Sequence, residues 1–127
     1  MIEKLRKRMA GDEGFTLIEL LVVIIIIGIL LAIAVPSYLG FKDRANKSAA
    51  QANVRAAIPA VETFFADHNT YAGMTKSSLL LYDAGLKVSI GGTPALSTTT
   101  YCIYNTVGGA QYMKAGPAGS ITAGACA

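Results

Sequence analysis

The order of apolar and polar positions divides the chain into stretches of different character. Residues 1–14 mix charged and apolar side chains, and the 22 residues from Leu20 to Phe41 then carry no charge. From Ala50 to Phe64, apolar residues recur at i, i+4 and i+7, which is typical of an amphipathic helix. After Gly73 the chain consists of short strand-like runs punctuated by paired glycines. The pattern therefore predicts a long helix followed by a small β-rich body.

One helix is predicted from about Thr16 to about Ala66, roughly 50 residues and ~75 Å long at 1.5 Å per residue. Pro36 and Pro59 each remove a backbone donor and should bend it. The expected buried stripe is Ala50, Val54, Ala57, Val61 and Phe64, widened by Ile58 and Phe65. One row along the helix consists of small residues: Ala45, Ala49, Ala52 and Ala56. The row either allows another helix to approach closely or reflects only the high helix propensity of alanine.

The body after residue 73 reads as an antiparallel meander, because its turns are too short for the crossovers that parallel strands need. The strand-like runs are residues 87–90, 98–107, 110–114 and 120–122, and the Gly91-Gly92 and Gly108-Gly109 pairs mark turns. A short helix is expected over Ser77 to Ala84, ended by Gly85. The predicted class is α+β: a long N-terminal helix, half transmembrane and half amphipathic, packed on an antiparallel sheet of three to four strands.

Composition excludes several classes of protein. Hydrophobic residues make up 53% of the 127 residues and charged residues 15%, which excludes a disordered charged tail. One His and two Cys leave too few groups for most metal-dependent or triad enzymes, so no enzyme, cofactor or metal site is expected. The net charge of +3 does not gather on the basic face that is typical of nucleic-acid binders.

The apolar run is too long for a secretory signal peptide, and its end from Ala34 to Tyr38 is a poor cleavage site. It fits a membrane anchor whose basic cluster, Lys4 to Arg8, stays cytoplasmic. Glu19 lies just inside the run, although a carboxylate at the centre of a membrane helix costs about 2.5–3.5 kcal/mol. Near the end of the helix the cost is smaller, so Glu19 either snorkels to the head groups or has a partner.

The segment Gly14-Phe15-Thr16-Leu17-Ile18-Glu19, followed by an unbroken apolar helix, resembles the processing site of type IV prepilins. Further matches are Gly28, Pro36, Tyr38 and Phe41, where many a-type pilins have a glycine, a helix-bending proline and aromatics. The resemblance is specific over 14–41, consistent over 42–71 and only architectural beyond.

The resemblance implies a prepilin peptidase that cuts after Gly14 at the cytoplasmic face and methylates the new amine of Phe15. It divides the chain into a leader (1–14), a transmembrane and assembly helix (15–41), an amphipathic helix with its exit loop (42–72) and a β-rich head (73–127). Glu19 would pair with the Phe15 amine of a neighbouring subunit and set the register of assembly. Gly28 and Pro36 mark where the helix would loosen in a fibre.

The function implied is a structural subunit of a type IV pilus, inserted in the cytoplasmic membrane and polymerised into a surface filament. Implied partners are other copies of the chain, the peptidase, the assembly platform and its assembly and retraction ATPases. Adhesion, twitching motility and DNA uptake all fit, and nucleic acid would be a partner only through uptake.

Two alternatives remain open. A pseudopilin of a type II secretion system shares the N-terminal pattern, but that family binds calcium through acidic residues near the C-terminus, and no Asp or Glu follows Asp83 here. A current-carrying filament would use the aromatic residues, although aromatics on an anchor helix are ordinary packing: Phe15, Tyr38, Phe41, Phe64 and Phe65.

Cys102 and Cys126 are the only cysteines. A pair on the non-cytoplasmic side of an anchor favours a disulfide over two buried thiols, and closing a loop of about 25 residues contributes roughly 3 kcal/mol. His68 is expected to be an exposed loop residue and not a metal ligand. The glycosylation pattern Asn46-Lys47-Ser48 is interpreted as a coincidence.

Overall fold

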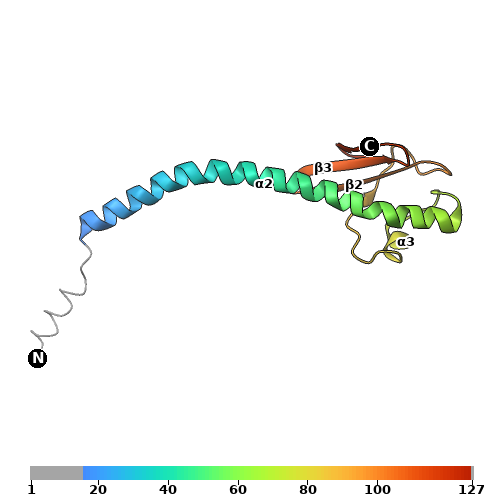
Figure 1. The fold of residues 1–127 in the computed structure, drawn as a ribbon, viewed down its shortest axis with the longest axis horizontal. Coiled ribbons are helices and arrows are strands. Elements are labelled where there is room, and N and C mark those ends of the chain that lie inside the picture. The colour runs from blue at the N-terminus through green and yellow to red at the C-terminus, as the bar shows by residue number, and fades with distance from the viewer. Residues whose placement is uncertain (1–15, 127) are drawn as a thin grey trace, which may run out of the picture. The chain divides into compact units, whose positions relative to one another are not determined.

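The computed structural model describes residues 16–126. Helix α2 spans Leu17–His68, and the short helix α3 spans Lys76–Leu80 (Figure 1). The strands are β1 (Ser89–Ile90), β2 (Tyr101–Val107), β3 (Ala110–Gly116) and β4 (Ile121–Ala123). The chain separates into two compact units that divide between Gly40 and Phe41, and each is described by itself.

The first unit contains the apolar beginning of α2. Every residue from Thr16 to Gly40 is exposed, so none of these side chains is buried within the unit. Pro36 lies inside the helix without ending it. A bend at this residue stays a prediction.

The second unit has its own core, and the expected stripe on α2 faces it. Ala50, Val54, Ala57, Val61 and Phe64 are all buried, which confirms the sequence prediction. Ala60 is buried with them, whereas Ile58 and Phe65 are only half-buried. Helix α2 runs through Pro59 to His68, two residues beyond the expected end at Ala66.

Helix α2 ends in a left-handed residue. Asn69 has a φ of 56°, and its backbone N–H donates to the Phe65 carbonyl at 2.7 Å. Asparagine tolerates this conformation better than most residues, and the hydrogen bond satisfies one of the helix's last carbonyls.

The sheet is the predicted antiparallel meander, with strand order β1-β2-β3-β4. Its register aligns Ile90 with Ile103, then Lys114, then Ile121 across the four strands. Gly108 and Gly109, the turn between β2 and β3, both have positive φ (54° and 86°), as the tightest hairpin turns require. In the view of Figure 1, β2 and β3 are drawn above α2 and α3 below it.

Two strands are shorter at their N-terminal ends than the sequence predicts. β1 holds only Ser89–Ile90 instead of 87–90, because the side chain of Asn105 on β2 donates to the Lys87 carbonyl at 2.6 Å, in place of a backbone ladder. β2 begins at Tyr101 instead of Thr98. A turn precedes it, in which the Ser97 N–H donates to the Thr100 carbonyl at 3.0 Å.

Helix α3 is also shorter than the expected span from Ser77 to Ala84. It starts at a capping box in which Thr75 and Ser78 exchange side chain to backbone hydrogen bonds. It ends at Leu80, so Gly85 is not its terminator. The next residues turn back instead, because the N–H groups of both Tyr82 and Asp83 donate to the Leu79 carbonyl.

Candidate functional site

Glu19 belongs to a capping box at the start of α2. Its N–H donates to the Thr16 hydroxyl at 3.2 Å, and its Oε2 accepts from the Thr16 N–H at 3.2 Å. The pattern Thr-x-x-Glu is the usual sequence signature of this motif, so the capping role of Thr16 could have been predicted from the sequence, and the sequence analysis missed it. The box places the carboxylate at the positive end of the helix dipole.

The second carboxylate oxygen of Glu19, Oε1, has no hydrogen bond within residues 16–126. A carboxylate accepts through both oxygens, so Oε1 has the capacity to accept from a further donor. The junction between Gly14 and Phe15 lies outside the described residues. The structure therefore does not test the expected cleavage, the methylation or the pairing of Glu19 with Phe15.

The helix on both sides of Glu19 exposes a long row of apolar side chains. Leu17, Ile18 and Phe41 are 86%, 72% and 71% exposed, and the large apolar side chains between them are exposed as well. The helix is long and apolar enough to cross a membrane. Gly28 and Pro36 lie within it, and nothing surrounds the position that a Cβ on Gly28 would take. Such a surface requires a bilayer or other protein to cover it.

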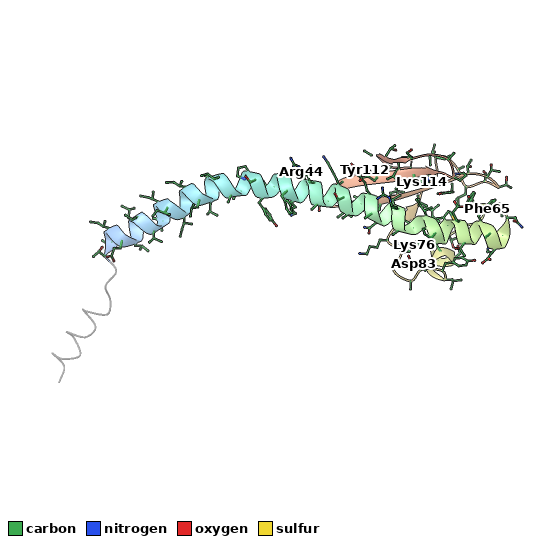
Figure 2. All side chains as sticks on the ribbon, viewed as in Figure 1. Arg44, Phe65, Lys76, Asp83, Tyr112 and Lys114 are labelled. Carbon is green, nitrogen blue, oxygen red and sulfur yellow. A yellow bond between two sulfur atoms is a disulfide. The ribbon has the colours of Figure 1, made fainter. Side chains whose placement is uncertain are left out.

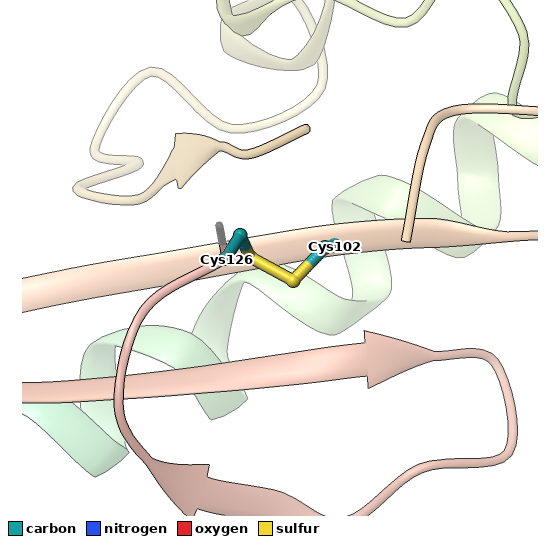
Figure 3. The surroundings of a disulfide bond; sticks show 2 residues. All are labelled: Cys102 and Cys126. Atoms are coloured by element: carbon teal, nitrogen blue, oxygen red, sulfur yellow. A yellow bond between two sulfur atoms is a disulfide. The ribbon is translucent and has the colours of Figure 1, made fainter. Parts of the chain in front are cut away.

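A disulfide joins Cys102 on β2 to Cys126, with the two Cα atoms 5.9 Å apart (Figure 3). Cys102 is fully buried, and its carbonyl accepts from the Gly91 N–H at 2.9 Å. A Cβ on Gly91 would overlap the Cys126 side chain, so only glycine fits where the C-terminal segment crosses the end of β1. The disulfide thus fixes the last described residues to the centre of the sheet.

A buried polar contact that the sequence analysis missed joins α2 to the sheet. The Asn53 amide donates to Asn105 Oδ1 at 3.0 Å, and the Asn105 amide donates onward to the Lys87 carbonyl. Asn105 is 8% exposed, so both of its hydrogen bonds replace lost water contacts.

Lys114 closes the loop between β3 and β4. Its side chain, labelled on the sheet in Figure 2 with Tyr112, donates to the carbonyls of Pro117 and Gly119.

Two tyrosines lie in the core of the second unit with different hydrogen bonding. The Tyr71 hydroxyl donates to both oxygens of Glu62 at 3.2 Å. The Tyr101 hydroxyl is buried and has no partner within residues 16–126. Burial first, and the nearby Glu62 carboxylate second, raise the pKa of both hydroxyls above the ordinary value.

His68 and Asn46 each contact other residues of the second unit. His68 is exposed as expected but ends α2 and does not sit in a loop. Its ring stacks on Phe64 at 4.1 Å between centroids, and Nδ1 lies 3.0 Å from the Phe64 carbonyl oxygen. Asn46 is half-buried against Gly108 in the turn between β2 and β3.

Within residues 16–126, no three His, Cys, Asp or Glu side chains lie close enough together to hold a metal ion.

An exposed apolar helix that is long enough to cross a membrane, together with a disulfide-stapled α+β head, is the arrangement typical of membrane-anchored subunits. Residues 9–35 match the family model described as the prokaryotic N-terminal methylation motif. The type IV wide pilus major component PilA4 of Thermus thermophilus is 37% identical over 111 residues, covering 87% of this chain and 78% of that protein. The chain belongs to the type IV pilin family.

Two further relatives match about half of this chain. The type IV major pilin protein PilA of Myxococcus xanthus is 44% identical over 61 residues, which are 48% of this chain and 28% of that protein. The type II secretion system core protein G of Vibrio cholerae is 37% identical over 65 residues, or 51% of this chain and 44% of that protein. The chain therefore spans less than half of these two relatives.

Proposed function

We propose that the chain is the structural subunit of a type IV pilus, made as a membrane-inserted prepilin and polymerised through its N-terminal helix into a surface filament. The observation that carries the proposal is the contrast between the two units. The core of the second unit, built from buried residues between Ala50 and Ile103, is complete without the first. The first is an exposed apolar helix that needs lipid or other copies around it.

The first step of the proposed pathway is the cut between Gly14 and Phe15 by a prepilin peptidase, with methylation of the new Phe15 amine. The match to the methylation motif over residues 9–35 supports it. The cut creates a cation at Phe15 that the precursor lacks. The basic residues of the 1–14 leader keep this end at the cytoplasmic face of the membrane before assembly.

The second step is the pairing of that cation with Glu19 of a neighbouring copy. The capping box contributes here, because the Thr16 N–H partly satisfies the carboxylate before a neighbour arrives. The other oxygen then accepts the ammonium group in a low-dielectric environment, where an unpaired charge is strongly unfavourable. Gly28 and Pro36 would let the helix adjust as copies pack, because each weakens the helix locally.

The proposed partners are other copies of the chain, the peptidase, the assembly platform and the ATPases that drive assembly and retraction. The subunit would reside in the cytoplasmic membrane before assembly and on the cell surface afterwards. Adhesion, twitching motility and DNA uptake are the functions such a filament would serve, and the role is structural rather than enzymatic.

A pseudopilin of a type II secretion system is the second candidate, because core protein G of Vibrio cholerae is similar to about half of this chain. The absence of any Asp or Glu after Asp83 disfavours the carboxylate-rich calcium site that the pseudopilin alternative implies. In this chain the Cys102–Cys126 disulfide, instead of a calcium site, fixes the C-terminal segment.

Deletion of the gene tests the proposal. Electron microscopy of the deletion strain should show no surface filaments, and expression of the wild-type chain should restore them. Intact filaments together with a loss of secreted enzymes would overturn the proposal in favour of the pseudopilin.

A further inference from the structure

Four hydroxyl residues follow one another in the turn that precedes β2: Ser97, Thr98, Thr99 and Thr100. The loop that contains them, residues 91–100, also holds Thr93 and Pro94 and carries no charge. Stretches rich in serine and threonine with proline are typical acceptors of O-linked sugars. Composition does not distinguish one hydroxyl of the loop from another, but the hydrogen bonds of the turn do.

Two of the four hydroxyls hold the turn together. Ser97 Oγ accepts from the Thr99 N–H at 3.2 Å and from the Thr100 N–H at 3.0 Å. The same oxygen lies 2.7 Å from Thr100 Oγ1, which donates to the Ala95 carbonyl at 2.8 Å. Ser97 and Thr100 are both half-buried. A bulky substituent on either oxygen would displace the contacts that close the turn.

The other two hydroxyls, those of Thr98 and Thr99, lie at the tip of the turn. Both residues are exposed, and neither side chain makes a hydrogen bond within residues 16–126. The turn is closed below them, since the Ser97 N–H donates to the Thr100 carbonyl at 3.0 Å. Neither residue belongs to a helix or a strand, so an enzyme can reach both hydroxyls without opening regular structure.

We propose that the hydroxyls of Thr98 and Thr99 are acceptors of O-linked sugar. In the transfer, the threonine oxygen forms a bond to the anomeric carbon of a sugar carried on a nucleotide diphosphate or a polyprenyl diphosphate. The bond between that carbon and the diphosphate oxygen breaks, and the diphosphate leaves with the electron pair. The hydroxyl proton passes to a base of the transferase. The inference goes beyond the proposed function, because it concerns a loop of the head and not the assembly helix.

A neutral sugar fits this part of the chain better than a phosphate does. A phosphate adds a charge of about −1.5 to −2 and is stabilised by arginine or lysine partners. No charged residue lies between Lys87 and Lys114, so the stretch around the turn supplies no such partner. A sugar adds hydroxyl groups, which hydrate a surface that is poor in charge without needing a countercharge.

Peptide mapping of filaments from the native host tests the assignment. Trypsin cuts after Lys87 and Lys114, so one peptide holds the turn together with two other exposed threonines, Thr93 and Thr106. After reduction of the disulfide, mass spectrometry should find this peptide heavier by one or more sugar residues. Electron-transfer fragmentation, which leaves O-linked sugars attached, should place the added mass on the threonines at the tip of the turn.

Substitution separates a modification site from a structural role. Thr98→Val combined with Thr99→Val removes both hydroxyls at nearly constant shape and should abolish the added mass. Thr98→Ser combined with Thr99→Ser keeps both hydroxyls and should retain it. Thr106→Val is the matched control, since it removes the hydroxyl of an exposed threonine on β2 and should leave the added mass unchanged.

A wild-type peptide without sugar would overturn the inference. So would sugar found only on other residues, sugar that survives the double valine variant, or a phosphate in place of the sugar. The same peptide can be prepared from the membrane fraction, so the test does not depend on filaments. Filaments that lack this chain would instead overturn the proposed function itself, so the two failures are distinguishable.

Discussion

Replacing Glu19 with glutamine removes its charge but keeps an oxygen that can accept from the Thr16 N–H. The capping box accepts Glu or Gln at this position, so the helix start should survive the change. What is lost is the proposed partner of the Phe15 amine. Leaving one charge of a desolvated pair uncompensated costs about 3–5 kcal/mol. That corresponds to roughly two to four orders of magnitude in the association constant of each subunit.

Thr16→Ala is the matched control, because it breaks the capping box but leaves the carboxylate. The loss of an N-cap costs about 0.5–2 kcal/mol, and the charge pair remains. We therefore expect fewer filaments from Thr16→Ala and none from Glu19→Gln or Glu19→Ala. Each variant is expressed without the wild type, cleavage is scored by gel shift, and filaments are counted by electron microscopy. Normal filament numbers from a fully cleaved Glu19→Gln chain would refute the pairing.

Three further predictions concern the second unit and use a fragment covering residues 41–127. Cys102→Ser should lower its free energy of unfolding by about 2–4 kcal/mol in chemical denaturation, and equal stability would show that the disulfide contributes nothing. Asn105→Ala should lower it by about 1–3 kcal/mol, because it leaves the Asn53 amide without its partner; a neutral effect would contradict the contact. Tyr101→Phe should be within about 1 kcal/mol of wild type or more stable, since the lost hydroxyl has no partner within residues 16–126. The unfolded tyrosine ionises near its ordinary pKa of 10.0 and the folded one only at higher pH, so stability should fall as pH rises above 10.0, less steeply in Tyr101→Phe.

Much of the architecture could be predicted because it depends on local periodicity. The stripe from Ala50 to Phe64 repeats with the helix, and β2 and β3 are joined by a glycine pair that only a tight turn explains. The capping box of Thr16 and Glu19 could also have been found, because its sequence signature was present.

The remaining features depend on partners far apart in the sequence. Asn53 and Asn105 are 52 positions apart, and no local pattern pairs them. The shortening of β1 follows from the same side chain, since Asn105 occupies the Lys87 carbonyl. The orphan hydroxyl of Tyr101 is equally invisible in the sequence, because tyrosine at a core position does not reveal whether a partner lies within reach.

Intact mass spectrometry of the main protein band from sheared surface filaments tests the central claim most directly. The account predicts a chain that begins at Phe15, has lost the 14 residues of the leader, carries one added methyl group and retains the Cys102–Cys126 disulfide. A main band formed by a different protein, or this chain with its leader still attached, would contradict it.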